Sequence, residues 1–265
     1  MKNPAKIFIF LEKPKKDKEK FVNSIINNIP YFDDIGYAGY KSKNALKEFL
    51  IWSIYGFKQN ERWESVDIEK IKKIIEETII KCKSVINQKI KIFVFPTIDN
   101  FIIEKMDGVA GFSPWRNTMI INLNPTKKMD SVLKDTVGHE LAHALALNYN
   151  ERITIQDDLI FEGIAEHFKE NFVNKKKSKW VKSIPKKIAL KILGEIKSKL
   201  NMRDKQLYKD LFFGSAKYPL WVGYAIGYYI IDNYLKNHKI EWNKFIKISP
   251  KEIINENNKL KYMAL

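Results

Sequence analysis

Two histidines and a glutamate at a fixed spacing are the residues of this chain best suited to chemistry. His139-Glu140-Leu141-Ala142-His143 is an H-E-x-x-H sequence in a segment whose apolar residues recur at helical spacing. Side chains four residues apart lie on one face of an α-helix, so both imidazoles can bind one metal ion, with Glu140 beside the attacking water. The chain has only 4 histidines and two stand here, which disfavours a core helix with incidental histidines. The spacing predicts a zinc site with Glu140 as general base.

A catalytic zinc site needs a third protein ligand and leaves the fourth position to water. Two carboxylates follow the motif at Glu162 and Glu166, four residues apart and hence on one helical face. Glu162 stands 19 positions after His143, which leaves room for a turn and a second helix that returns to the metal. We expect Glu162 to bind the metal and Glu166 to accept a hydrogen bond from a ligand histidine. The swapped assignment and a solvated Glu166 are the alternatives, and His167 is expected to be exposed or to cap the helix.

Other kinds of zinc site are excluded by the residues present. Cys82 is the single cysteine, so neither an internal disulfide nor a cysteine-based zinc site can form. The long metzincin motif requires glycine at position 146 and histidine at position 149, where this chain has Ala146 and Tyr149. A third histidine ligand could come only from His167 or His238, and neither has a motif around it. A carboxylate is therefore the expected third ligand.

Three segments together resemble a known class of zinc enzymes. They are His139-Glu140-Leu141-Ala142-His143, Glu162-Gly163-Ile164-Ala165-Glu166 and Trp221-Val222-Gly223-Tyr224-Ala225-Ile226-Gly227-Tyr228. The first two look like the gluzincin metallopeptidases, and all three are similar to the YjaZ-like family of predicted zinc-dependent proteases, which is bacterial. The likeness covers roughly Val94 to the C-terminus. It implies a zincin-like fold, Zn²⁺ as the cofactor, and a peptide or protein substrate that is hydrolysed.

The resemblance also implies an edge strand that holds the substrate. Gluzincins lay the peptide along an edge strand beside the zinc, and residues 108–112 are the candidate here. Gly111 in that segment is expected to bind the substrate, because glycine lets another backbone approach closely. A turn or bulge without a role in binding is the alternative.

A tyrosine is expected to assist the metal at the oxyanion, because related peptidases carry one about sixty residues after the glutamate ligand, which here is Glu162. Tyr224 stands at that distance, and Tyr228 lies on the same helical face. We expect Tyr224 to donate a hydrogen bond to the developing oxyanion and Tyr228 to contact the substrate, and the two could exchange these roles. Packing of both rings in the core is the alternative.

The formal charge of +16 invites a nucleic-acid partner, because clustered cations release counterions from phosphate backbones. Base-edge and bidentate phosphate recognition favours arginine, yet the arginines are only Arg62, Arg116, Arg152 and Arg203. The rest of the positive charge is lysine, spread over nearly every segment, so we expect no nucleic acid partner. Two alternative functions stay open: a zinc site that hydrolyses another amide or is not catalytic, and a basic nucleic-acid-binding protein with an incidental H-E-x-x-H.

The pattern of apolar residues predicts an α+β fold, zincin-like and mostly helical, with a small central mixed sheet next to the metal-bearing helices. Helices are expected over 20–29, 43–55, 67–85, from Asp130 as N-cap, from 157 or 158 to 172, over 185–200 and 218–235, and near the C-terminus. Strands are expected over 89–95, 108–112 and 118–123, with Pro114 and Asn117 in the last turn, and residues 174–179 as a surface loop. We expect a single domain over 1–265, with a helical part over 1–88 and a catalytic part over 89–265.

The beginning of the chain carries one short apolar run, from Ile7 to Leu11, which is too short for a signal segment or a membrane span. Elsewhere charge interrupts every apolar run before about 18 residues. We therefore expect a cytoplasmic protein without a membrane span. The oligomeric state has no signature in the sequence.

Overall fold

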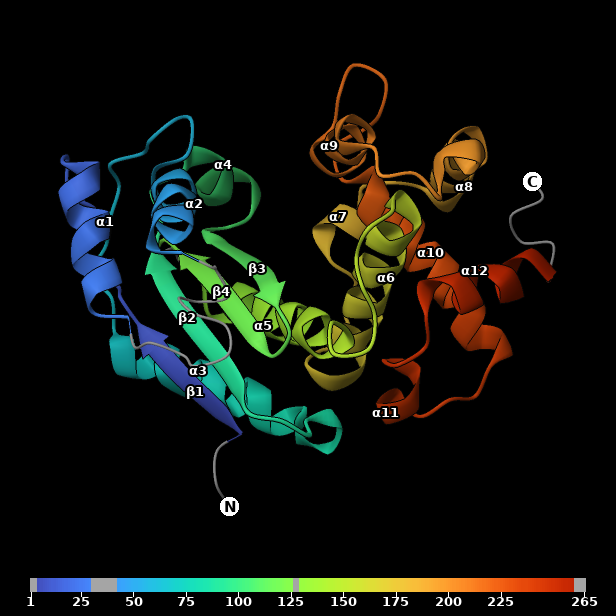
Figure 1. Cartoon of the computed structure of the whole chain (residues 1–265), viewed down its shortest axis with the longest axis horizontal. Helices are drawn as coiled ribbons and strands as arrows, with labels where there is room; N and C mark the ends of the chain where they lie inside the picture. The colour runs from blue at the N-terminus through green and yellow to red at the C-terminus, as the bar shows by residue number, and fades with distance from the viewer. Residues whose placement is uncertain (1–3, 30–41, 126–128, 260–265) are drawn as a thin grey trace. The chain divides into compact units, whose positions relative to one another are not determined.

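The computed structural model describes residues 4–29, 42–125 and 129–259, and the chain forms two compact units, Met1–Ala144 and Leu145–Leu265 (Figure 1). The first unit contains a four-stranded sheet with helices packed on it. The described part of the second unit consists of helices and loops. This is the predicted α+β architecture with one small mixed sheet. The single domain with parts that meet near residue 88 stays a prediction.

The sheet of the first unit has the strand order β1-β2-β4-β3. Its strands are β1 (Ala5–Ile9), β2 (Ile90–Pro96), β3 (Val109–Trp115) and β4 (Thr118–Leu123). β1 and β4 run parallel to β2, and β3 pairs antiparallel with β4, so β3 lies at an edge of the sheet. The three expected strands are present, and β1 is an additional strand. Asn117, with φ of 55°, lies in the turn between β3 and β4, whereas Pro114 lies within β3 and not in the turn as predicted.

Several helices of the first unit begin at capping residues. The helices are α1 (Lys18–Asn27), α2 (Lys43–Tyr55), α3 (Ile68–Lys81), α4 (Asn100–Lys105) and most of α5 (Met129–Ala146), with the short 3-10 helix η1 (Lys83–Val85) after α3. Asp17, Ser42 and Asp67 accept hydrogen bonds from backbone N–H groups in the first turns of α1, α2 and α3. Asp130 was expected to be the N-cap of α5, but it lies inside the first turn of that helix. Its carboxylate pairs there with Nζ of Lys70 at 2.7 Å.

A core fills the space between the sheet and helices α1 and α2. Phe93 and Phe95 of β2 and Ile120 of β4 belong to it, together with buried residues such as Phe21 of α1 and Leu50 of α2. Side chains alternate between the two faces of a strand, so the remaining residues of β2 and β4 face the opposite side of the sheet. The sheet is thus covered by apolar side chains, and its strands are accordingly rich in β-branched and aromatic residues.

Two helices of the second unit pack closely through glycines. Its helices are α6 (Ile155–Phe172), α7 (Lys179–Lys182), α8 (Lys186–Glu195), α9 (Lys205–Phe213), α10 (Val222–Asn237), α11 (Trp242–Phe245) and α12 (Pro250–Lys259), with the 3-10 helix η2 (Lys197–Lys199) after α8. A Cβ on Gly163 of α6 would lie 2.2 Å from the carbonyl oxygen of Gly227 in α10, and a Cβ on Gly227 would lie 2.0 Å from that of Leu159. Only glycine therefore lets α6 and α10 pack backbone to backbone.

Some boundaries in the second unit differ from the predicted ones. α6 begins at Ile155, earlier than expected, because Thr154 is its N-cap and forms a capping box with Asp157. α10 begins at Val222 and not at 218, and the helix expected over 185–200 is divided into α8 and η2. The lysine-rich loop ends where α7 begins, at Lys179. The short helices α4, α7, α9 and α11 are additional to the predicted elements.

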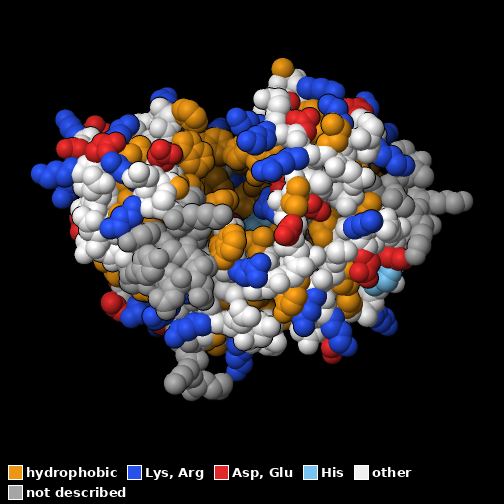
Figure 2. Space-filling model, viewed as in Figure 1, with side chains coloured by type: hydrophobic (Ala, Val, Ile, Leu, Met, Phe, Trp, Pro, Cys, Tyr) orange, Lys and Arg blue, Asp and Glu red, His pale blue; other side chains and the backbone are white. Residues whose placement is uncertain are grey.

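Lysine and arginine side chains are dispersed over the face of the molecule shown in Figure 2, with acidic and neutral side chains between them. Among the helices that the structure describes, none combines the length and the apolar character needed to cross a bilayer. The cytoplasmic location and the absence of a nucleic-acid partner stay predictions.

Candidate metal centre

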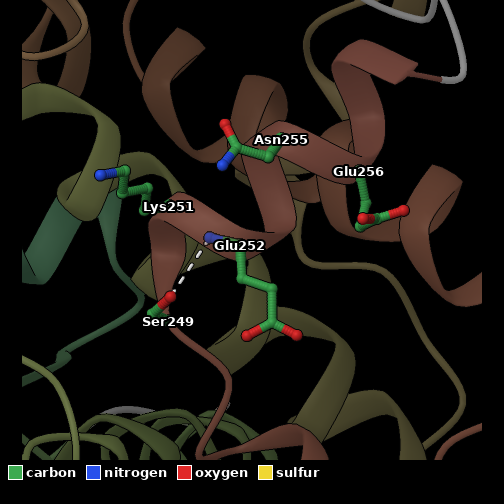
Figure 3. A pocket seen from close by; sticks show the side chains of 5 residues that line it. All are labelled: Ser249, Lys251, Glu252, Asn255 and Glu256. Carbon is green, nitrogen blue, oxygen red and sulfur yellow. Dashed lines mark hydrogen bonds between the residues drawn. The ribbon is translucent and has the colours of Figure 1, made fainter.

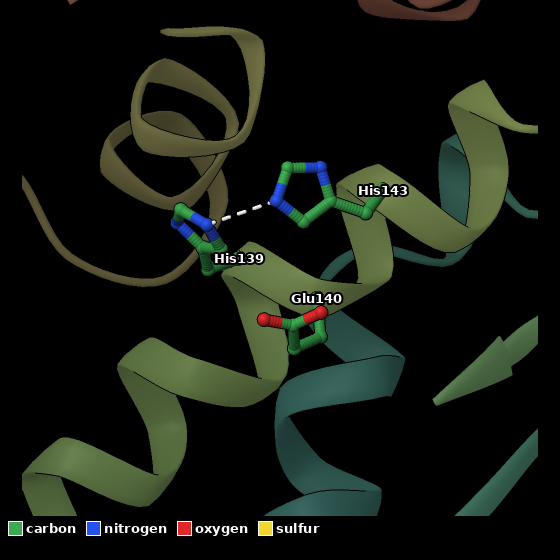
Figure 4. Close-up of side chains that lie close together, drawn as sticks. All are labelled: His139, Glu140 and His143. Carbon is green, nitrogen blue, oxygen red and sulfur yellow. Dashed lines mark hydrogen bonds between the residues drawn. The ribbon is translucent and has the colours of Figure 1, made fainter. Parts of the chain in front are cut away.

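The two histidines of the H-E-x-x-H motif converge on one side of α5 (Figure 4). Nε2 of His139 and Nε2 of His143 lie 3.0 Å apart. The rings meet edge to face, with centroids 4.7 Å apart and an interplanar angle of 81°. Both residues are buried, with 7% and 5% of their surface exposed. The helical spacing of four residues therefore brings two nitrogen donors together, as the sequence predicts.

The donor atoms fit a divalent metal ion. Two nitrogens that each lie ~2.0–2.1 Å from a tetrahedral zinc are ~3.3–3.4 Å apart, close to the 3.0 Å between the two Nε2 atoms. A carboxylate oxygen of Glu140 joins them in a group whose potential ligand atoms all lie within 4.8 Å of one another. Imidazole nitrogen and carboxylate oxygen are among the ligands that zinc takes in proteins. These three side chains can therefore surround a small cation and a water molecule.

Glu140 is held by strand β3. Oγ of Ser113 donates a hydrogen bond to Oε2 of Glu140 at 2.8 Å, and the same hydroxyl lies 2.9 Å from the carbonyl oxygen of Glu140. Glu140 is buried, with 6% of its surface exposed, so this contact replaces hydrogen bonds to water that its carboxylate would otherwise make. A second contact joins the turn after β3 to α5, because the backbone N–H of Asn117 donates to the carbonyl oxygen of Ala144 at 2.9 Å.

Gly111 makes room for the same glutamate. A Cβ at position 111 would lie 2.2 Å from Cγ of Glu140 and 2.7 Å from both Cδ and Oε1. No side chain fits there while Glu140 keeps its position, which gives the glycine a physical reason within the chain itself. Gly111 lies in the edge strand β3, as predicted. Its predicted contact with a substrate stays a prediction.

Glu162 lies in α6, in the second unit, and is held by an arginine. Nη2 of Arg152 donates to Oε1 of Glu162 at 2.7 Å, and Nε of Arg152 donates to Oδ1 of Asp158 at 2.6 Å. Burial opposes the charge on Arg152, but the carboxylates of Glu162 and Asp158 outweigh it and raise the pKa of Arg152 above its usual value. Glu162 is 4% exposed, so its charge is stabilised chiefly by such partners. Its role as a metal ligand stays a prediction.

Glu166, one turn after Glu162 on α6, is completely buried. Nε1 of Trp180 donates to its Oε1 at 2.8 Å, and Oγ of Ser178 and Nζ of Lys169 donate to its Oε2 at 2.6 and 3.0 Å. The alternative of a solvated helix carboxylate is therefore wrong. The predicted hydrogen bond from a ligand histidine is untested and stays a prediction.

The two candidate tyrosines of α10 differ in their surroundings. Tyr224 is partly buried and packs against Phe212, with ring centroids 5.2 Å apart. Tyr228 is buried, and its Oη donates to Oε2 of Glu170 at 3.1 Å. Burial and the neighbouring Glu170 carboxylate raise the pKa of Tyr228 above its usual value. The tyrosine roles stay predictions.

His167 is neither exposed nor a helix cap, in contrast to the prediction. Its ring stacks on that of Tyr228 with centroids 4.2 Å apart, and its Nε2 lies 3.1 Å from the carbonyl oxygen of Tyr228. Burial lowers the pKa of His167 from its usual value of 6.5. His167 therefore joins α6 to α10 as a packed side chain.

A family model with the description "Predicted Zn-dependent protease (DUF2268)" matches residues 71–255. This chain belongs to that family. The match includes β3, α5, α6 and α10, and therefore every candidate site residue named above. Membership of a family described as predicted zinc-dependent proteases is thus confirmed, while the finer likeness to YjaZ-like proteins stays a prediction.

A protein of Bacillus subtilis is also similar to this chain. The chain is 21% identical over 169 residues to "Uncharacterized protein YjfC" of Bacillus subtilis (strain 168), a match that covers 58% of this chain and 56% of that protein. The chain thus spans little more than half the length of this relative. No solved structure matches the chain.

Among the residues of this family member that contact candidate site residues and are absent from the sequence prediction, two hold Glu140 and Glu162. Ser113 contacts Glu140 from a position 27 residues away, and Arg152 contacts Glu162 from a position 10 residues away. Neither belongs to a motif. Two features of the sequence could have indicated them. Ser113 stands two positions after Gly111 in a strand, and Arg152 is one of few arginines in a lysine-rich chain.

A pocket of about 520 Å³ opens in the second unit beside the start of α12 (Figure 3). Its lining is polar and consists of Ser249, Lys251, Glu252, Asn255 and Glu256. The backbone N–H of Glu252 donates to Oγ of Ser249 at 3.2 Å, which is an ordinary contact at a helix start. This pocket contains none of the candidate site residues.

Proposed function

We propose that this protein is a zinc-dependent peptidase in which His139, His143 and Glu162 hold the metal and Glu140 is the general base. The observation that carries the proposal is that the Nε2 atoms of two buried histidines lie 3.0 Å apart, in a group with Glu140 whose potential ligand atoms all lie within 4.8 Å of one another. Membership of a family described as predicted zinc-dependent proteases supports the same conclusion.

The choice of Glu162 as third ligand is supported by its burial and its position. Glu162 is 4% exposed, and a buried carboxylate needs a cation or several hydrogen bonds to remain charged. Arg152 holds one of its oxygens and thereby restricts the orientation of the carboxylate. The separation of 19 residues from His143 is the spacing on which the assignment rests.

Zinc, when bound, would lower the pKa of a water molecule and polarise the scissile carbonyl. Glu140 takes a proton from the attacking water and delivers it to the leaving nitrogen. Tyr224 donates a hydrogen bond to the oxygen on which negative charge develops.

The substrate in this proposal is a peptide that lies along β3. This strand is at the edge of the sheet, and Gly111 and Ser113 within it touch the general base. An extended peptide can add to such an edge through main-chain hydrogen bonds. The scissile bond would then lie next to Glu140. Besides Gly111, we propose that Tyr228, which lies on the same helical face of α10 as Tyr224, contacts the substrate.

Metal analysis and two variants test the proposal. Protein purified without a histidine tag should contain about one zinc per chain, and a defined-peptide library read by mass spectrometry should show cleavage. Glu140→Gln should keep the zinc and lose turnover, because the amide cannot accept the proton. His143→Ala should lose both zinc and turnover. Full activity of Glu140→Gln would refute the general-base role, and stoichiometric zinc without any cleavage would indicate a non-catalytic metal site.

A further inference from the structure

Two residues of β3 enclose the side chain of Glu140. Gly111 and Ser113 are two positions apart in the strand, and both contact Glu140. Phe112 between them faces the other way, where its ring stacks on that of Phe49 in α2 with centroids 5.6 Å apart. Gly111 and Ser113 thus present a glycine and a hydroxyl to α5, in a strand whose register with β4 shifts between Phe112 and Trp115.

The two contacts restrict Glu140 in different ways. At Gly111 the side chain of Glu140 lies directly against the strand backbone. A Cβ at position 111 would lie only 2.2 Å from Cγ of Glu140, so Glu140 occupies the space that a larger residue would fill. At Ser113 the hydroxyl donates to Oε2 at 2.8 Å. The same hydroxyl lies 2.9 Å from the carbonyl oxygen of Glu140, so it is tethered to the helix that carries the carboxylate. Ser113 therefore joins strand β3 to both the carboxylate and the backbone of Glu140 in α5.

We propose that Gly111 and Ser113 are positioning residues that fix the carboxylate of Glu140 for proton transfer. This inference rests on the proposed role of Glu140 as general base. A carboxylate with three rotatable bonds has many positions open to it, and proton transfer requires one of them. Gly111 provides the space for that position, and Ser113 selects the rotamer with a directed hydrogen bond. Both contacts described above are to Glu140, which is not one of the proposed metal ligands, so we expect their loss to change turnover and not metal binding.

The test measures kcat, KM and zinc content separately on a peptide from the library. Ser113→Ala should lower kcat about tenfold, since one hydrogen bond of ordinary strength is lost. Ser113→Thr should restore most of it, because the hydroxyl returns. Gly111→Ala should lower kcat about a hundredfold, because the added Cβ displaces the carboxylate by an ångström or more. Zinc content should stay at the wild-type level in all three variants, and KM should stay at that level in the two Ser113 variants. KM of Gly111→Ala is left out of the test, because Gly111 is also proposed to contact the substrate.

Ser53→Ala is the matched control. Ser53 is a buried serine of the same unit, in α2, whose hydroxyl lies 3.5 Å from a carbonyl oxygen of its own helix, that of Leu50. Its kcat should not change. If Ser113→Ala lowers kcat no more than Ser53→Ala does, or if Ser113→Thr does not restore it, the positioning role is wrong.

Crystal structures of the metal-free Gly111→Ala and Ser113→Ala variants provide a measurement that does not depend on activity. In Gly111→Ala the Glu140 carboxylate should leave its place against β3, and in Ser113→Ala it should occupy more than one rotamer. An unmoved, well-ordered Glu140 in both variants would overturn the inference. If the wild-type protein cleaves no peptide, the proposed function fails, and these structures still decide whether β3 positions Glu140.

Discussion

The substitution Arg152→Met tests how the proposed ligand Glu162 is held. Arg152 bonds Glu162 at 2.7 Å and Asp158 at 2.6 Å, and Glu162 is 4% exposed. Methionine fills a similar volume but leaves both carboxylates without this partner. Removal of one partner from a fully buried ion pair costs about 3–5 kcal/mol. Because the Arg152 side chain is 23% exposed, we expect a loss of about 2–3 kcal/mol. For a chain of this size that free energy lowers the melting temperature by roughly 4–12 °C.

The assay is urea unfolding at pH 7 in the presence of a chelator, so that zinc does not contribute to stability. Arg203→Met is the matched control, because Arg203 is an exposed arginine of the same unit, and it should change the unfolding free energy by less than ~0.5 kcal/mol. The double variant Arg152→Met/Glu162→Gln should recover part of the lost free energy of unfolding, because it also removes the negative charge of Glu162. The reasoning is refuted if Arg152→Met is no less stable than Arg203→Met, or if Glu162→Gln gives no recovery.

Two further predictions concern packing and pH. Gly227→Ala should destabilise the protein by at least ~1–3 kcal/mol, because its Cβ would lie 2.0 Å from the carbonyl oxygen of Leu159; a melting temperature equal to that of the wild type would contradict this. Burial lowers the pKa of His167 below 6.5, so the unfolded chain binds that proton more readily. The contribution of neutral His167 to the free energy of unfolding should therefore be fully present above about pH 6.5, and it should be lost as the pH falls through the lowered pKa. Urea unfolding at pH 7.5 and 5.5 should show that His167→Gln reduces this decline, and an equal decline in both proteins would exclude His167 as its source.

The local patterns in the sequence predict most elements because their causes are local. The period of α5 and the four-residue spacing of its histidines depend only on the geometry of one helix, and Nε2 of His139 and Nε2 of His143 lie 3.0 Å apart as expected. The expected strands of residues 89–95 and 118–123 are stopped by prolines or turns within a residue or two of where β2 and β4 end. The start of α6 was also within reach, since Thr154 and Asp157 stand at the spacing of a capping box.

The remaining features depend on contacts between distant residues. β1 is a short apolar run whose identity as a strand comes from its parallel pairing with β2, some 85 positions later in the register. Ser113 reaches Glu140 only because the fold places β3 against α5. Arg152 reaches Glu162 only because the segment before α6 turns back toward that helix. Gly111 was singled out for the approach of a substrate, and the structure adds a second reason, the space needed by Glu140. Residue types and spacing predict candidate ligands and a general base; they do not predict the side chains that position these residues.

The most direct measurement is a crystal structure of the untagged protein, with anomalous diffraction recorded on both sides of the zinc absorption edge. The account predicts one strong anomalous peak, with Nε2 of His139, Nε2 of His143 and a carboxylate oxygen of Glu162 each about 2.0–2.2 Å away, and with Glu140 beside it but not bound. A peak held by other residues, or no peak in a protein whose histidines stay paired at 3.0 Å, would contradict it.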